Sequence, residues 1–212
     1  MVSRLQVTQG TESAEKTAVR KRILEAAFAA FEKNGYVAAS TLEIATRARV
    51  SKRELYALVG SKHEMLVACI RARASRLKVP AELAVPRDRV ELAQVLVSYG
   101  TQLLREVTEP TVITVFRLAI ADAVRAPEVA RALDSIGREA SRTALLQIMI
   151  QAQSLGLLTG RPADLVERFS GLLWGNLMVG LLLGVAERPN AREITARARY
   201  AAEAFLQLHS SD

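Results

Sequence analysis

The stretch STLEIATRARVSKRELYALVGSKHE, residues 40–64, decides the fold that this sequence predicts. The pattern Ser-x-x-Glu occurs in it three times, as Ser40 with Glu43, Ser51 with Glu54 and Ser61 with Glu64. In such a capping box the serine oxygen accepts a hydrogen bond from an N–H of the first helical turn, and the glutamate accepts one from the N–H of the serine. Starts 11 and 10 residues apart therefore predict two short helices and the beginning of a third.

The apolar residues between these starts recur at helical spacing, and they are Ile44, Ala45, Ala48, Leu55 and Val59. The second helix carries Lys52, Arg53 and Tyr56 on its outer side, close to its N-terminus. Two short helices joined by a tight turn, with basic and aromatic side chains opening the second, are typical of a helix-turn-helix that binds DNA. A helical hairpin with a solvated basic face is the alternative from these residues alone.

The charge of the chain is unevenly distributed. The formal net charge is +7, and residues 1–78 carry 15 Lys and Arg against 7 Asp and Glu, whereas residues 79–212 carry 14 against 15. A basic first third beside a near-neutral remainder indicates that one part of the chain meets a polyanion.

Cysteine and histidine usage narrows the class of protein. The single cysteine, Cys69, excludes an intramolecular disulfide framework and a Cys-rich zinc site, and it fits a reducing, cytoplasmic location. The two histidines, His63 and His209, lie far apart in the sequence. We therefore expect no metal site and no cofactor.

The first half of the chain divides into three segments. Residues 1–16 lack both apolar periodicity and the apolar core of a signal peptide, which predicts a disordered arm and no export. Residues 17–62 form the predicted DNA-binding domain, whose first helix runs from Thr17 to Asn34. A connecting helix over residues 63–79 follows, and the prolines at 80 and 86 mark the boundary to a second domain over residues 80–212.

The motifs ILEAAFAAFEKNGY at 23–36, ST-x-x-IA-x-x-A-x-V-S-x-x-x-LY at 40–56 and GSKHEML at 60–66 resemble the N-terminal domain of the TetR family of transcriptional regulators. The resemblance covers about residues 20–70. It implies that the helix starting at Ser51 enters the major groove. It also implies a homodimer on a palindromic operator, released by a small molecule in the C-terminal domain, and a repressor rather than an activator.

The resemblance assigns the DNA contacts to the segment from about Ser40 to Val59 and the start of the next helix. Thr41, Tyr56 and Lys62 are expected at phosphates. Lys52 and Arg53 suit guanine O6 and N7, and the sequence does not decide which of them reads a base. The complete set of expected contacts is Thr41, Leu42, Arg49, Ser51, Lys52, Arg53, Tyr56 and Lys62.

Three departures from the family pattern leave the operator sequence open. Arg49 replaces the usual turn glycine, and a left-handed non-glycine residue costs roughly 1 kcal/mol unless its charge compensates. Glu54 would repel phosphate if it pointed outward, and a role in the capping box is the interpretation we favour. Leu58 and Val59 replace an aromatic pair. If these changes spoil the surface, the alternative function is a helical interaction protein with only weak, nonspecific DNA binding.

The rest of the chain has helical periodicity throughout. We expect helices at about 87–107, 111–124, 128–154, 163–186 and 191–208, with prolines close to their starts. The whole chain is then all-α, with about nine helices and no strand. The stretch ALDSIGREASRTALLQIMIQAQSLGLL resembles, more loosely, the helical regulatory domains of one TetR subgroup.

Residues 169–186 contain no charged residue, so a membrane span has to be weighed against a buried helix or a subunit interface. Ser170, Asn176 and four glycines favour the interface. The resemblance implies that this helix and the last one pair with those of a second copy. The expected dimer contacts are Gly171, Gly175, Gly180, Gly184 and Phe205.

A mostly apolar set of side chains with a few amides is expected to surround a ligand pocket for a lipophilic or aromatic effector. The set is Tyr99, Gln102, Leu103, Phe116, Ile120, Gln147, Ile150, Trp174 and Met178. The alternative for each residue is plain core packing. No Gly-rich phosphate loop, GxSxG motif or His/Cys/acid cluster is present in the sequence, so no enzymatic reaction can be assigned.

Overall fold

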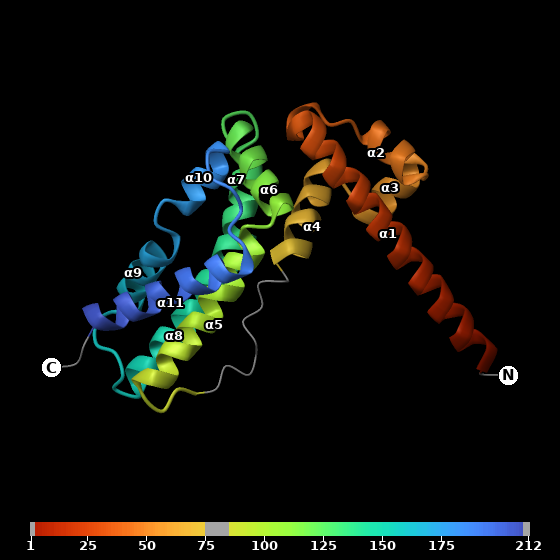
Figure 1. Ribbon diagram of the computed structural model, residues 1–212. Coiled ribbons are helices and arrows are strands. Elements are labelled where there is room, and N and C mark those ends of the chain that lie inside the picture. The colour runs from red at the N-terminus through yellow and green to blue at the C-terminus, as the bar shows by residue number, and fades with distance from the viewer. Residues whose placement is uncertain (1–2, 75–84, 210–212) are drawn as a thin grey trace. The chain divides into compact units, whose positions relative to one another are not determined.

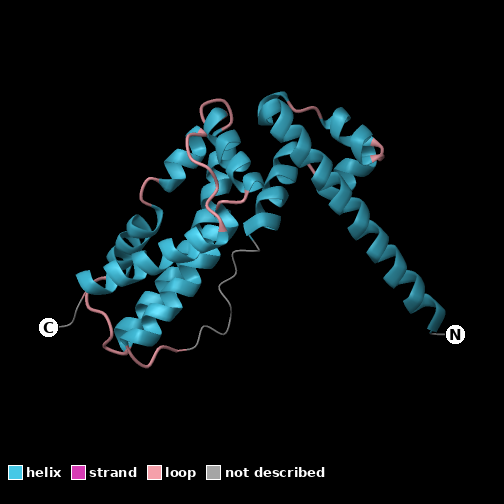
Figure 2. Cartoon of the chain, in the orientation of Figure 1, coloured by secondary structure: helices cyan, strands magenta, loops and turns pink. Residues whose placement is uncertain are grey.

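Figure 1 shows the computed structural model of the chain, in which residues 3–74 and 85–209 are described. The described residues form helices joined by turns and contain no strand, which confirms the all-α prediction (Figure 2). They fall into two compact units, Met1–Ala72 with Arg117–Leu133 and Arg73–Phe116 with Asp134–Asp212. The predicted boundary near residue 80 lies outside the described residues. The sequence did not predict that segment 117–133 joins the first unit.

The first unit contains the helices predicted around the helix-turn-helix. These are α1 Ser3–Ala38, α2 Thr41–Ala48, α3 Lys52–Val59 and α4 Lys62–Ala74. Their inward side chains follow the apolar pattern of the sequence, and the fully buried ones include Ile23, Phe31, Ile44, Leu55 and Met65. Because α2 and α3 are too short to be stable alone, this shared core holds them in place.

Helix α1 differs from the prediction at its start. It begins at Ser3, so residues 3–16 are helical rather than an irregular arm. Extending an existing helix adds a hydrogen bond for each residue fixed, so it needs no apolar periodicity, which was the basis of the prediction. At the other end Gly35 leaves the helical conformation, with φ 77° and ψ 164°, close to the predicted end of the helix.

The second unit is built mainly from α5 Arg89–Val107, α8 Glu139–Ser154, α9 Pro162–Trp174, α10 Leu177–Leu183 and α11 Ala191–Leu208. Helix α6 Pro110–Ala121 is divided between the units, and α7 Pro127–Leu133 belongs to the first. The prolines at 110, 127 and 162 occupy the first position of their helices, as predicted.

Two predicted helices are broken in the structure. The segment 128–154 becomes α7, a π-helical turn at Asp134–Arg138 and α8. The segment 163–186 becomes α9 and α10, because Gly175 adopts φ 44° and ψ −128°. Arg197 of α11 stabilises the end of α9, where its Nε donates to the carbonyl of Leu173 and its Nη2 to that of Trp174, both at 2.7 Å. A cation on helix C-terminal carbonyls also interacts favourably with the helix dipole.

This break gives three of the four glycines a role within their own chain. Gly175 and Gly184 end helices in positive-φ conformations. A Cβ on Gly180 would lie 2.8 Å from the Cβ of Ala186, so this glycine packs against its own chain. A Cβ built on Gly171 would have no neighbour within 4 Å. Gly171, Gly175 and Gly184 are all exposed, so their place in a dimer interface stays a prediction.

The core of the second unit lies between α5, α8, α9 and α11. Phe169 and Phe205 are fully buried there, with an edge-to-face ring contact at 5.6 Å between centroids. Phe205 therefore has no exposed surface for a second copy, and its predicted place in a dimer interface is wrong. Within the described ranges, no helix is both long enough and apolar enough to cross a membrane.

Replacing Gly175 with Ala should destabilise the second unit by about 1–3 kcal/mol, because an L residue at this positive φ is strained. The added Cβ would also lie 2.9 Å from Nη2 of Arg197. Gly171→Ala is the matched control, since Gly171 lies inside α9 with open space at its Cβ position. That change should be neutral or stabilise by about 0.5–1 kcal/mol. Urea unfolding of both variants measures the difference, and equal stability would contradict the break at Gly175.

Candidate nucleic-acid interface

The three predicted helix starts are capped by their serines in different ways. Ser40 Oγ accepts from the N–H of Leu42 at 3.2 Å, and the carboxylate of Glu43 accepts from Asn34 Nδ2 at 2.9 Å. The structure therefore gives Ser40 its capping role but shows no reciprocal box with Glu43, because Glu43 is used to hold the end of α1. Helix α2 is thus tied to α1 at its first turn.

Ser61 and Glu64 form the complete capping box that the sequence predicted. The N–H of Ser61 donates to Glu64 Oε2 at 2.7 Å, and the N–H of Glu64 donates to Ser61 Oγ at 3.2 Å. These hydrogen bonds to Ser61 lower the pKa of the Glu64 carboxyl group. The carboxylate is therefore held in its charged form at the start of α4.

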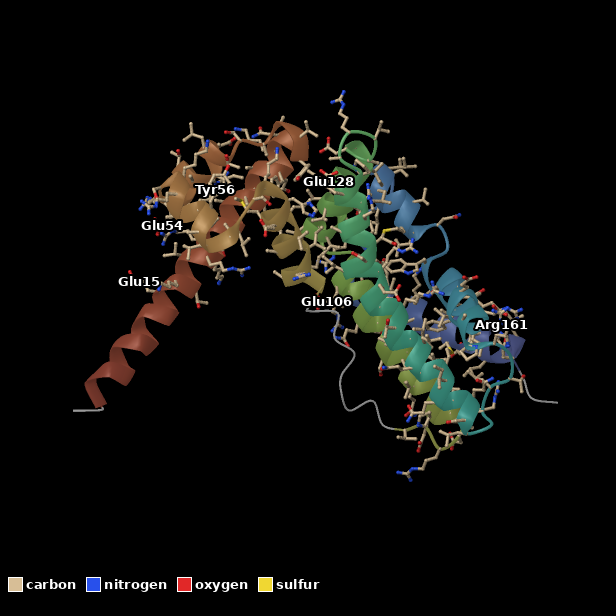
Figure 3. All side chains as sticks on the ribbon, turned by 180° about the vertical axis from the view of Figure 1, so that it is seen from behind. Glu15, Glu54, Tyr56, Glu106, Glu128 and Arg161 are labelled. Carbon is tan, nitrogen blue, oxygen red and sulfur yellow. The ribbon has the colours of Figure 1, made fainter. Side chains whose placement is uncertain are left out.

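Ser51 caps α3 by accepting from the N–H of Glu54 at 3.0 Å. The side chain of Glu54 is exposed, and in the described structure the N–H of Ser51 does not donate a hydrogen bond to the Glu54 carboxylate. The capping role favoured for the Glu54 carboxylate is therefore not found. Figure 3 shows Glu54 at the surface of α3, where it adds a negative charge beside the exposed cations.

Arg49 forms the turn between α2 and α3 in the left-handed conformation usually taken by glycine, with φ 55° and ψ 48°. It is the one non-glycine residue with positive φ among those the structure describes. Its N–H donates to the carbonyl of Thr46 at 3.1 Å, and the N–H of Val50 donates to that of Ala45 at 3.0 Å. These bonds satisfy carbonyls at the end of α2 in the manner of a Schellman motif. The turn is therefore retained without glycine.

Arg22 of α1 provides a support for this turn that sequence reasoning missed. Its Nε donates to the carbonyl of Ala48, the last residue of α2, at 2.7 Å across 26 residues of sequence. A charged donor at a helix C-terminus makes a strong hydrogen bond and opposes the negative end of the helix dipole. No sequence motif marks Arg22 for this role, because it depends on how α1 lies against α2.

The side chains predicted to face DNA lie at the surface of α2 and α3. Lys52 and Arg53 are exposed, Leu42 is 61% exposed and Tyr56 is 45% exposed. The hydroxyl of Tyr56 donates to Thr41 Oγ1 at 3.3 Å, which brings together two residues predicted at phosphates. Arg47 and Arg49 add two further exposed cations on the same helix pair. This surface offers the point charges and forked donors that phosphates and guanine edges accept.

Lys62 is placed differently from the other cations. Its Nζ donates to the carbonyl of Val37 at 3.0 Å and to that of Ala39 at 3.3 Å, and it lies 4.9 Å from the centre of the Tyr36 ring. An ammonium group has three donors, so two of them are engaged within the chain. The predicted phosphate contact of Lys62 is therefore in competition with a structural one.

The residues predicted to line a ligand pocket fall into an inner and an outer group. Tyr99 and Leu103 are buried in the core of the second unit. Others are half-buried, namely Gln102, Phe116, Trp174 and Met178. The outer group does not face the interior of its units, since Gln147 is exposed, Ile150 is 49% exposed and Ile120 is 60% exposed. In α8 the inward positions are instead 145, 148, 149 and 152, which leaves 147 and 150 on the opposite side of the helix.

The described residues contain no cluster of three or more His, Cys, Asp or Glu that could hold a metal ion.

Arg49→Gly should raise the free energy of unfolding by about 1 kcal/mol, because glycine adopts the left-handed turn without a Cβ penalty. The same change should weaken binding to duplex DNA at low salt, since an exposed positive charge is lost. Urea unfolding and a DNA titration test both effects. Arg47→Ala is the control, because it removes a charge within the right-handed α2 and should give no stability gain. A destabilised Arg49→Gly variant would mean that the Arg49 side chain itself holds the turn.

Comparison with known proteins assigns both parts of the chain to one family. Residues 23–69 match the model of bacterial regulatory proteins of the tetR family, and residues 94–210 match the AefR-like transcriptional repressor C-terminal domain. The second match alone covers more than half of the chain. None of the curated proteins compared with the chain matches it.

Solved structures agree with this assignment. A TetR transcriptional regulator from Agrobacterium tumefaciens is 26% identical, with a TM-score of 0.73 over 90% of this chain and 94% of that one. The flavonoid-responsive regulator FrrA is 25% identical, with a TM-score of 0.76 over 92% of this chain and 100% of that one. A TetR family regulator from Pseudomonas syringae pv. tomato, 24% identical with a TM-score of 0.66 over 89% and 95% of the two chains, shares the fold. The chain therefore belongs to the TetR family of bacterial transcriptional regulators, which are DNA-binding proteins and not enzymes.

Proposed function

We propose that this regulator is a repressor that binds a palindromic operator as a homodimer and leaves it when a small molecule binds the second unit. The observation that carries the proposal is the short α3, which follows a fixed turn and exposes Lys52, Arg53 and Tyr56 next to Thr41. A recognition helix placed in this way presents its N-terminal residues to base edges and leaves its flanks to phosphates.

Within this surface, Arg53 and Lys52 are the residues proposed to read bases. Both can donate to guanine O6 and N7, and a bidentate contact contributes roughly 1–3 kcal/mol of discrimination. Tyr56 and Thr41 are proposed at a phosphate, because their hydroxyl groups already meet at the surface. The exposed Glu54 disfavours phosphate nearby, so it restricts how α3 lies in the groove.

Homodimer formation is supported by apolar side chains that one copy leaves exposed on the second unit. Val179 and Leu183 of α10 are 58% and 71% exposed, and Val185 is 80% exposed. Tyr200 and Leu208 of α11 are 67% and 69% exposed. Side chains of this size cover one another when a second copy supplies the same helices, as closed two-fold symmetry requires.

The proposed effector is a lipophilic, flat aromatic molecule. Three half-buried members of the predicted ligand set are aromatic or apolar and pack against the core, namely Phe116, Trp174 and Met178. The hydroxyl of Tyr99 donates to the carbonyl of Ser141 at 2.9 Å, and burial raises the pKa of this phenol, so it stays neutral. The similar FrrA is named for its response to flavonoids, a class of this shape.

Operator binding can be tested by selecting bound sequences from random duplex DNA at about 0.15 M salt. We expect a palindrome, because a two-fold dimer reads two identical half-sites. Arg53→Ala should change the selected half-site, whereas Arg142→Ala, which removes an exposed arginine from α8, should not. Weak recovery without a pattern would instead favour the helical interaction protein with nonspecific DNA binding.

Effector release can be tested with a flavonoid aglycone as the probe. Addition to the protein–operator complex should lower the bound fraction, measured by fluorescence anisotropy of labelled DNA. Trp174 is the only tryptophan of the chain, so its emission should change in parallel if the probe enters the second unit. A saturated aliphatic acid of similar mass is the control ligand. Release by the acid and not by the flavonoid would contradict the aromatic assignment.

A further inference from the structure

The connection, residues 35–39, consists of the last turn of α1 after its kink at Gly35 and of Ala39, and it is held at its first residues by a carboxylate from a distant part of the chain. Gly35 departs from the helical conformation there, and the next N–H, that of Tyr36, donates to Asp122 Oδ2 at 2.8 Å. Asp122 lies 86 residues further along the chain, directly after α6, and is only 8% exposed. A charged acceptor in a buried setting makes this a strong hydrogen bond.

The same connection is held at its far end by α4. Lys62, the first residue of α4, donates to the carbonyls of Val37 and Ala39. The N–H of Ala39 donates to the carbonyl of Gly35 at 3.2 Å, which closes the connection into one turn. Its two ends are therefore fixed by side chains of opposite charge, both from within the first unit.

Tyr36 lies between these two supports and is 6% exposed. Its ring packs against Phe31 at 5.7 Å between centroids, and the Lys62 ammonium lies over the ring, 4.9 Å from its centre. Burial, followed by the carboxylates of Glu128 and Asp122, raises the pKa of the Tyr36 hydroxyl group. Glu128 belongs to α7, at the position labelled in Figure 3. The aromatic ring thus anchors the connection among α1, α4 and segment 117–133.

The connection leads directly into the DNA-facing surface. Ala39 precedes Ser40, the capping residue of α2, and Thr41 follows with its hydroxyl bonded to Tyr56 of α3. A single residue, Ser40, therefore separates Ala39, whose carbonyl is held by Lys62, from Thr41, whose side chain is proposed at a phosphate. A shift of the connection would carry the first turn of α2 with it.

We propose that Asp122 and Lys62 are positioning residues for operator binding, which fix the connection 35–39 and thereby the start of α2 without touching the DNA. The inference rests on the proposed operator binding and gives Lys62 a role other than the phosphate contact expected from the sequence. Two donors of its ammonium group are already used by the chain's own carbonyls. An ammonium group that is bonded to the protein's own carbonyls displaces few counterions when the protein binds DNA.

The salt dependence of operator affinity separates a positioning role from a phosphate contact. Each lost phosphate contact reduces the magnitude of the negative slope of log affinity against log salt by about 0.9. Lys62→Met and Asp122→Ala should therefore weaken operator binding on the order of 10-fold with the wild-type slope. Lys52→Met, the matched change at the exposed lysine of α3, should make the salt dependence less steep, because a solvent-exposed cation in the groove displaces counterions whether it meets a base or a phosphate. Asp122→Asn keeps an acceptor oxygen for the Tyr36 N–H and should recover most of the affinity. Glu139→Ala, at an exposed carboxylate of α8, should behave as wild type.

Two results would overturn the proposal. A salt slope whose magnitude is smaller by about 0.9 in Lys62→Met would show that Lys62 contacts a phosphate. Wild-type affinity in Asp122→Ala would show that Asp122 has no positioning role. Thermal unfolding of each variant, with Asp122→Asn as the milder change, checks that the fold is intact.

Amide hydrogen exchange tests the positioning role without DNA. Both Asp122→Ala and Lys62→Met should speed exchange over residues 36–42, whereas Glu139→Ala should not. Unchanged exchange in both variants would reject the inference. If the wild-type protein selects no operator, the proposed function fails, and this exchange measurement still decides whether Asp122 and Lys62 hold the connection.

Discussion

The carbonyl of Ala48 at the end of α2 receives a hydrogen bond from Arg22 at 2.7 Å, and the geometry of the surface proposed to face DNA depends on it. Helix α2 is eight residues long, and the last four carbonyls of any helix have no partner inside the helix. With Arg49 in a left-handed conformation that costs about 1 kcal/mol, the turn needs support from outside α2. Arg22 supplies that support from α1, and α3 follows in a fixed direction.

The same solution recurs at other helix ends. Lys62 binds the carbonyls of Val37 and Ala39 at the end of α1, and Arg197 binds those of Leu173 and Trp174 at the end of α9. In each case a basic side chain from a different helix satisfies the free carbonyls and opposes the negative end of the dipole. The basic residues of this chain are therefore of two kinds, those that hold helices together and those that face solvent.

This division changes the meaning of the charge asymmetry. The excess of Lys and Arg over residues 1–78 indicates a polyanion partner, yet Arg22 and Lys62 are bonded to the protein backbone. The exposed cations of α2 and α3 are the ones proposed to meet DNA, and the acidic Glu54 is exposed beside them. Net charge alone overstates how much of the first unit is available to phosphates.

The sequence by itself determined the helices, because their start residues and apolar periodicity are local properties. Ser40, Ser51 and Ser61 each cap the helix that follows. The exposed basic face of α3 followed from its register, since Leu55 and Val59 must point inward.

Only the tertiary structure decided which partners those helices found. Glu43 binds Asn34 instead of completing a capping box, and Lys62 binds the α1–α2 connection. Gly175 ends α9, whose last carbonyls bind Arg197, where the sequence indicated a continuous helix. Asp122 reaches Tyr36 across 86 residues of chain. The reason is physical. A capping residue and an apolar repeat act within a few residues of their own helix, whereas these bonds depend on how separate helices pack, which no local pattern encodes.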